Sequence, residues 1–286
     1  MASADLDPEA PQWRGCAQLQ NDLHVDRIQD DLRTPRGLPE TGTVEVWYAP
    51  VVSPPGKGPF GVHPASAEDL RRARRFRSET SRTRFLSARR ALRSLLAGYL
   101  SVQGTGVVLS ADQRGKLHLG NPAEADGPIS FNVAHSGDWI ALAFGTGGAV
   151  GIDLEVEGRL PDLDALARRI LSPKEIEEFL DLPPELRPTL FFQAWTRKEA
   201  FLKALGVGLS LPPSQVPTGL GPEPTALRRL SSPVGEADDG EGWTVSSLPA
   251  PPGYAAAVSF QGLGGRVRVM EGPRPWLTDA HSIHSP

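Results

Sequence analysis

The chain has almost no cysteine and no apolar run long enough for a membrane. Its 286 residues include a single cysteine, Cys16, so an internal disulfide is impossible, as is usual in a reducing compartment. The N-terminal residues 1–7 lack the basic and apolar regions of a secretion signal. The apolar run Trp139–Phe144 is far too short to cross a bilayer. We therefore expect a cytoplasmic protein without a membrane partner.

An overall excess of positive charge is also missing. The formal net charge is −4, which argues against the whole molecule being a polyanion binder. Ten arginines nevertheless fall between Arg71 and Arg93. They are compatible with a solvated helix face, or with a nucleic-acid patch. No base-reading motif or aromatic interleaving accompanies them, so we expect no nucleic-acid partner.

Glycine and proline are abundant, with 30 and 28 residues, and they mark the connections between regular elements. The turn-rich segment Gly145–Gly148 is the predicted boundary between two halves. The predicted organisation is a loosely ordered leader (1–42), an N-terminal lobe (43–146), a C-terminal lobe (147–262) and a tail (263–286).

Hydrophobic periodicity predicts a mixture of helices and short strands in both lobes. A strand–helix–strand–strand order occurs once before Gly145 and once after it. The predicted strands are 43–49, 106–110, 129–137, 139–144, 149–156, 243–248 and 254–260, with an edge strand at 267–270. The predicted helices are 67–100 with a break near 78–81, 162–170, 173–180 and 191–205. A strand is expected after Gly208, and a weak helix near Leu227 within a long loop (212–242).

Charged residues on two of these elements suggest chemistry. Glu199 and Lys203 lie four apart and share a helix face, which by itself is typical of a solvated surface pair. Asp153 and Glu155 lie two apart in a predicted strand and point to the same side. Three carboxylates and a lysine could therefore converge on one metal–phosphate site.

At these residues the sequence resembles a known family. The segment Gly151-Ile-Asp-Leu-Glu155, followed about forty residues later by Trp195-Thr-Arg-Lys-Glu-Ala-Phe-Leu-Lys203, is similar to the paired signature of 4′-phosphopantetheinyl transferases. The chain length and Phe131-Asn-Val-Ala-His-Ser-Gly137 resemble the long, monomeric Sfp (surfactin-synthetase-activating) type. The resemblance implies an α+β fold. It also implies two similar lobes related by a pseudo-twofold axis. Each lobe would be a small antiparallel sheet on a long helix, with the active site in the cleft between the lobes.

The resemblance also implies an activity. Such enzymes transfer the 4′-phosphopantetheine arm of coenzyme A to a serine hydroxyl of an apo acyl or peptidyl carrier protein, and they release 3′,5′-ADP. Mg²⁺ is the expected cation, with Mn²⁺ as the other possibility, since hard oxygen ligands suit both. The alternative is a catalytically silent module that binds coenzyme A or a nucleotide phosphate on the same fold.

Site residues follow from the matching positions. The resemblance assigns the metal to Asp153, Glu155 and Glu199, and catalysis to Glu199 and Lys203. Glu199 is the preferred base for the serine proton, with Glu155 left open. Lys198 points away from Glu199 on the helix and is expected to face the nucleotide or the solvent. Coenzyme A is assigned to Arg71, Arg84, Gly115, Lys116, His135, Ser136 and Lys203. Leu117 replaces a usual proline, and Ala134 replaces a serine that some members use for the pyrophosphate.

Overall fold

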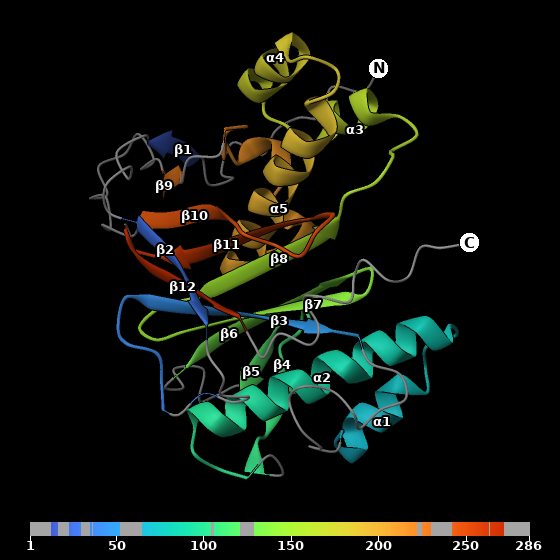
Figure 1. Ribbon diagram of the computed structural model, residues 1–286, viewed down its shortest axis with the longest axis vertical. Helices are drawn as coiled ribbons and strands as arrows, with labels where there is room; N and C mark the ends of the chain where they lie inside the picture. The colour runs from blue at the N-terminus through green and yellow to red at the C-terminus, as the bar shows by residue number, and fades with distance from the viewer. Residues whose placement is uncertain are drawn as a thin grey trace.

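The computed structural model describes residues 13–16, 23–29, 35, 37–51, 65–103, 106–120, 129–221, 225–229, 242–262 and 264–271. Its elements form four layers: a group of helices, two five-stranded sheets packed face to face, and a second group of helices (Figure 1). The predicted α+β class is confirmed. No helix within these ranges has the length and apolar character needed to cross a membrane.

Each sheet gathers strands from distant parts of the chain. Sheet one has the order β1 (Trp13–Cys16), β9 (Thr225–Arg229), β10 (Gly242–Leu248), β11 (Tyr254–Gln261) and β8 (Val150–Val156). Sheet two has the order β2 (Leu23–Gln29), β12 (Gly265–Glu271), β3 (Thr43–Pro50), β7 (Trp139–Gly145) and β6 (Ser130–Ser136). A separate hairpin joins β4 (Leu109–Ala111) to β5 (Leu117–Leu119). Strands β6 and β8 are thus edge strands of different sheets.

Four helices begin at a capping side chain, whereas the helix that starts at Arg187 has none. The expected break in the arginine-rich helix is confirmed, because Ser78 caps a new helix and leaves residues 74–78 outside both. Ser172 and Glu175 form a capping box, and Gly206 ends the last helix in the left-handed region. The helices are α1 (Ala67–Ala73), α2 (Glu79–Tyr99), α3 (Leu163–Ile170), α4 (Pro173–Asp181) and α5 (Arg187–Leu205), with short 3₁₀ turns η3 (Gly208–Ser210) and η4 (Pro213–Gln215).

Apolar side chains fill the spaces between successive layers. One cluster lies between α2 and sheet two, around Leu95 and Phe144. A second lies between the two sheets and includes Val46, Ile152 and Val258. Two further clusters cover the other face of sheet one, where α5 packs with α3 and α4. The cluster between the sheets buries one face of β8 and leaves its other face to α5.

The described residues before 43 and after 262 are more regular than the sequence predicted. We expected a loosely ordered leader, but its described part contains β1 and β2. The predicted strand at 267–270 exists as β12, yet it is not an edge strand, because it runs parallel between β2 and β3. The chain thus returns from the second half into the sheet of the first half. This pairing between distant segments has no local sequence signal.

Two other local predictions were wrong. The segment after Gly208 forms a 3₁₀ turn instead of a strand, and residues around Leu227 form strand β9 instead of a helix. The two halves share one strand order. In the first half, β6 and β7 form a hairpin and β7 pairs with β3; in the second half, β10 and β11 form a hairpin and β11 pairs with β8. This order agrees with two similar lobes; the pseudo-twofold axis and the domain boundaries stay predictions.

Candidate active site

Strand β8 supplies two carboxylates on the face that α5 covers. Ile152 and Leu154 point into the cluster between the sheets, so Asp153 and Glu155 lie on the opposite face. Gly151 makes the approach of α5 possible. A Cβ at that position would lie 2.1 Å from the carbonyl oxygen of Ala200 and 2.4 Å from the amide nitrogen of Ala204. The glycine therefore lets α5 pack directly against the strand that carries the acidic pair.

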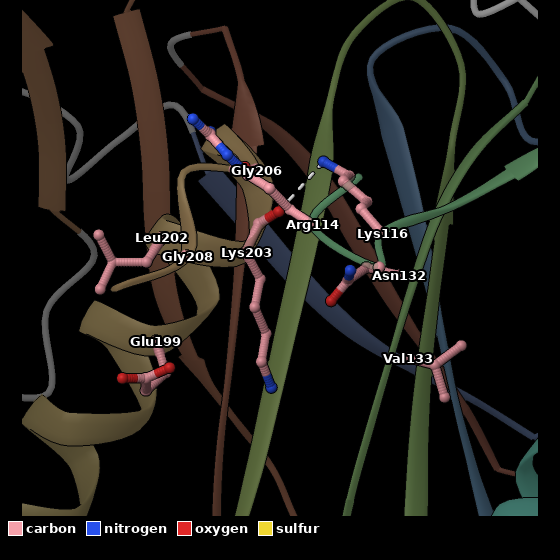
Figure 2. A pocket seen from close by; sticks show the side chains of 10 residues that line it. Arg114, Lys116, Asn132, Val133, Glu199, Leu202, Lys203, Gly206 and Gly208 are labelled. Atoms are coloured by element: carbon pink, nitrogen blue, oxygen red, sulfur yellow. Dashed lines mark hydrogen bonds between the residues drawn. The ribbon is translucent and has the colours of Figure 1, made fainter. Parts of the chain in front are cut away.

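Helix α5 brings a lysine to this acidic pair. Lys203 Nζ donates to Asp153 Oδ1 over 2.6 Å, and the Lys203 side chain is 33% exposed. Glu199 lies one turn earlier on the same face, and both residues line a pocket of about 360 Å³. Figure 2 shows Glu199 and Lys203 extending from α5 on one side of this pocket, with β6 on the other side.

The three predicted carboxylates interact electrostatically. Burial and the charge of Asp153 raise the pKa of Glu155, and the same two causes raise the pKa of Glu199. Asp153 Oδ2 is buried and has no hydrogen-bond partner among the described residues. In that part of the chain, no three His, Cys, Asp or Glu side chains form a ready metal cage. The carboxylates are thus a loose acidic group in which oxygen ligands remain available.

Strand β6 brings two predicted coenzyme A ligands to the same region. Ser136 Oγ donates to Glu155 Oε2 over 2.8 Å, which links the two sheets. His135 is exposed, yet partial desolvation by neighbouring atoms lowers its pKa, with Lys203 and Arg84 contributing through their charge. Arg84 Nε is buried and has no partner within the described ranges. Arg84 and Lys203 therefore form one positive group around His135, beside the acidic one.

The β4–β5 hairpin closes the pocket from the first half of the chain. Lys116 Nζ donates to the backbone oxygen of Lys203 over 3.1 Å, the dashed line in Figure 2, and to that of Ala204 over 2.8 Å. Arg114 adds a bond of 3.0 Å to the oxygen of Gly206. Basic side chains stabilise a helix C-terminus in this way, by satisfying its last carbonyl groups. The hairpin thus fixes the end of α5, and burial lowers the pKa of Lys116.

Two more predicted residues complete the comparison with the sequence. Gly115 lines the pocket, and its φ of +87° suits the tight turn between β4 and β5. Arg71 lies on α1, where it is mostly exposed and pairs with Glu68. No contact joins Arg71 to the pocket residues in the described structure. Gly115 therefore belongs to the site, whereas the assignment of Arg71 to the nucleotide stays a prediction.

Sequence reasoning missed residues that hold the site together. Asn132 lines the pocket, and its Oδ1 accepts a bond from the amide of Ile152 over 3.1 Å. A polar amide at an otherwise apolar strand position was the available signal. We expected Lys198 to face the nucleotide or solvent, which is wrong. It is fully buried and pairs with Glu175 over 2.6 Å, because the chain after α5 folds back over that face of the helix.

Comparisons with known proteins show the family to which the chain belongs. Residues 149–258, which carry the acidic pair and α5, match the 4′-phosphopantetheinyl transferase superfamily. The 4′-phosphopantetheinyl transferase HetI of Nostoc sp. is 34% identical over 222 residues, which span 77% of this chain and 89% of that protein. The chain belongs to the 4′-phosphopantetheinyl transferase superfamily. The resemblance inferred from the two-part motif is thereby confirmed.

Two members of the superfamily from Bacillus subtilis match a shorter part of this chain. A 4′-phosphopantetheinyl transferase of Bacillus subtilis is 32% identical over 147 residues, covering 51% of this chain and 62% of that protein. The transferase Sfp of Bacillus subtilis strain 168 is 30% identical with the same coverage. The matched family segment begins just before β8 and ends within β11, so it contains all three predicted metal ligands and Lys203.

Proposed function

We propose that this transferase moves the 4′-phosphopantetheine arm of coenzyme A to a serine hydroxyl of an apo acyl or peptidyl carrier protein. The serine oxygen forms a bond to the phosphorus on the pantetheine side of the pyrophosphate. The bond from that phosphorus to the bridging oxygen breaks, and 3′,5′-ADP leaves. The observation that carries the proposal is the meeting of a positive group and an acidic group at one cleft, on the residues of the family signature.

The positive group would bind the phosphates of coenzyme A. Arg84 has an unpartnered buried Nε among the described residues, and a guanidinium binds phosphate through several donors. His135 lies near both Arg84 and Lys203, and its exposed imidazole can donate to the same ligand. Lys203 donates to Asp153 and borders the same pocket, so an incoming phosphate would lie within its reach. Gly115 and Lys116 form the wall beside it.

The acidic group suits a hard divalent cation, Mg²⁺ or Mn²⁺. Asp153, Glu155 and Glu199 offer carboxylate oxygens, the ligand type that these cations prefer. The unpartnered Asp153 Oδ2 and the raised pKa values of both glutamates support this choice, because clustered carboxylates are stabilised by a cation. A bound cation would neutralise charge on the pyrophosphate and on the leaving group.

Glu199 is the proposed acceptor of the serine proton. A carboxylate that also holds a cation is a weak base, so Glu199 would take the proton through an intervening water molecule. The place of Glu199 on the pocket wall lets a carrier serine approach from solvent. Glu155 has a raised pKa as well, but its carboxylate already accepts a hydrogen bond from Ser136. Glu155 is therefore the second candidate.

Mass spectrometry of an apo carrier protein tests the proposal. Incubation with coenzyme A, Mg²⁺ and the transferase should add the mass of one phosphopantetheine arm, and omission of the cation should prevent the gain. Several purified carriers of the fatty-acid, polyketide and peptide-synthetase types should be compared side by side. Binding of coenzyme A without any mass gain on these carriers would favour the silent binding module.

A further inference from the structure

Two polar side chains of β6 join the edge strands of the two sheets. Asn132 Oδ1 accepts from the amide of Ile152 over 3.1 Å, and Ser136 Oγ accepts from the amide of Val156 over 3.1 Å. The two acceptors are four residues apart on β6, and the two amides are four residues apart on β8. The contacts therefore fix one register between β6 and β8, although no backbone ladder joins them.

Ser136 makes a second contact at the same point. While its oxygen accepts from Val156, its proton is donated to Glu155 Oε2 over 2.8 Å. A serine hydroxyl has a single proton to donate. In this arrangement that proton orients a carboxylate and is not available to a phosphate oxygen. The hydroxyl thus holds both the backbone of β8 and the side chain of Glu155.

The neighbour of Ser136 extends the connection to the positive group. Consecutive strand residues point to opposite faces, so His135 faces away from the side that carries Ser136. His135 interacts through its charge with Arg84 of α2 and with Lys203. A short piece of β6 therefore sets the distance between the phosphate-binding group and the carboxylates of β8.

We propose that Ser136 is a positioning residue for Glu155 and that Asn132 holds the register in which it acts. This inference rests on the proposed function and deepens it. It replaces a direct contact of Ser136 with coenzyme A, which the family resemblance implied, by an action through a carboxylate. The expected phenotype is a defect in cation binding, with the binding of coenzyme A itself largely unchanged.

The test compares variants of one strand. Mn²⁺ binding in the presence of coenzyme A is measured by electron paramagnetic resonance, and coenzyme A binding in EDTA by calorimetry. Ser136→Ala should weaken Mn²⁺ binding by about tenfold or more, the usual effect of removing an outer hydrogen-bond partner of a ligand. Coenzyme A binding in EDTA should stay near the wild-type value. Ser136→Thr keeps the hydroxyl and should restore Mn²⁺ binding.

Asn132 and Ser130 provide the matched comparisons. Asn132→Ala should accelerate amide hydrogen exchange at Ile152, whereas Ser136→Ala should do so at Val156, because each variant removes one acceptor. Ser130→Ala lies on the same strand outside these contacts and should leave all measurements unchanged. Ser136→Cys offers a weaker donor and acceptor, and serves with an intermediate expected effect if Ser136→Ala does not fold.

Two results would overturn the inference. One is Mn²⁺ affinity in Ser136→Ala equal to that of the wild type. The other is an equal loss of coenzyme A affinity in EDTA, which would assign Ser136 to a phosphate. If the wild-type protein transfers no phosphopantetheine to any carrier, the proposed function fails, and this inference fails with it. If the wild type transfers phosphopantetheine but Ser136→Ala binds Mn²⁺ as tightly as the wild type, the inference fails and the proposed function stands.

Discussion

Helix α5 carries two sets of charged side chains that lie in opposite environments, one buried and one at the pocket. On its covered side, Arg197 and Lys198 are buried beneath the loop that follows the helix. On its cleft side, Glu199 and Lys203 border the pocket. The four residues lie within two turns of one helix, so local sequence and propensity are nearly the same. What differs is the number of partners that each charge finds.

On the covered side, Lys198 and Glu175 each have several hydrogen-bond partners. Lys198 Nζ donates to Glu175 and to the backbone oxygens of Pro213 and Val216. Glu175 also accepts from the amides of Ser172 and Gly219. The charge of Lys198 lowers the pKa of Glu175 against the opposite effect of burial. This network ties α4 and the 212–221 loop to α5, which is a structural role.

The cleft side leaves its charges incompletely matched. Asp153 keeps a buried oxygen without a partner in the described structure, and the pKa values of Glu155 and Glu199 are raised. Clustered, partly satisfied carboxylates cost stability, and proteins retain such costs at functional sites. The presence of a charged residue in the signature motif therefore says little about its role. The partners of each charge separate the structural residues from the functional ones.

The largest effect should come from the cleft carboxylates. Asp153→Asn or Glu199→Gln should lower the rate of phosphopantetheine transfer by at least about 100-fold, because stabilisation of phosphate charge is lost. In Glu199→Gln the free energy of unfolding should stay the same or rise, because repulsion between carboxylates is relieved, whereas Asp153→Asn also weakens the pair with Lys203. Transfer kinetics and urea unfolding of the same preparations give both values. Glu178→Gln, on the exposed face of α4, is the control and should change neither.

The two lysines should behave in opposite ways. Lys198→Met breaks a buried ion pair and should lower the free energy of unfolding by about 3–5 kcal/mol. Lys203→Met removes a side chain that is a third exposed but leaves the buried Asp153 without its partner, and should cost about 1–3 kcal/mol while transfer is strongly reduced. Urea denaturation and transfer assays on both variants make the comparison. Equal destabilisation by the two substitutions would erase the distinction between the two sides of α5.

The packing of α5 on β8 is tested at a glycine. Gly151→Ala would place a methyl group against the backbone of Ala200 and Ala204, and should cost about 1–3 kcal/mol of stability. Transfer should fall as well, because Glu199 and Lys203 move away from Asp153. Gly158→Ala is the matched control, since no described atom lies within 4 Å of its added Cβ. Thermal unfolding and transfer rates that do not differ between the two variants would contradict this account.

The smallest effect on function is expected at the β4–β5 hairpin. Lys116→Met removes two bonds to the end of α5 and should cost about 0.5–1.5 kcal/mol for each bond. Coenzyme A binding, followed by calorimetry, should weaken by roughly tenfold or less, because the pocket wall is loosened. A loss far greater than this would show that Lys116 binds the nucleotide directly, as the family resemblance implied.

Local patterns in the sequence predicted much of the fold and the centre of the site. The alternation around Asp153 and Glu155 and the period of α5 each depend on neighbouring residues, so both were recognised correctly. The same holds for the break near residue 78 and for the helix that begins at residue 173. The sequence therefore predicted which elements carry the acidic residues and which face each one uses.

Features that depend on distant pairing could not be predicted. Strand β12 joins the sheet of the first half between β2 and β3, and no local pattern indicates such an insertion. Lys198 was misplaced because its partner Glu175 comes from another helix and the covering loop comes from beyond Gly206. The contact of Ser136 with Glu155 was not predicted, because it crosses from one sheet to the other. Each of these contacts joins segments far apart in the chain.

Cation binding by the cleft carboxylates is the central claim, and an equilibrium titration with Mn²⁺ in the presence of coenzyme A tests it most directly. Electron paramagnetic resonance should show saturable binding of one Mn²⁺ by the wild-type transferase. Asp153→Asn and Glu199→Gln should each weaken that binding by about tenfold or more, whereas Glu178→Gln should not. Unchanged Mn²⁺ affinity in both cleft variants would contradict the account.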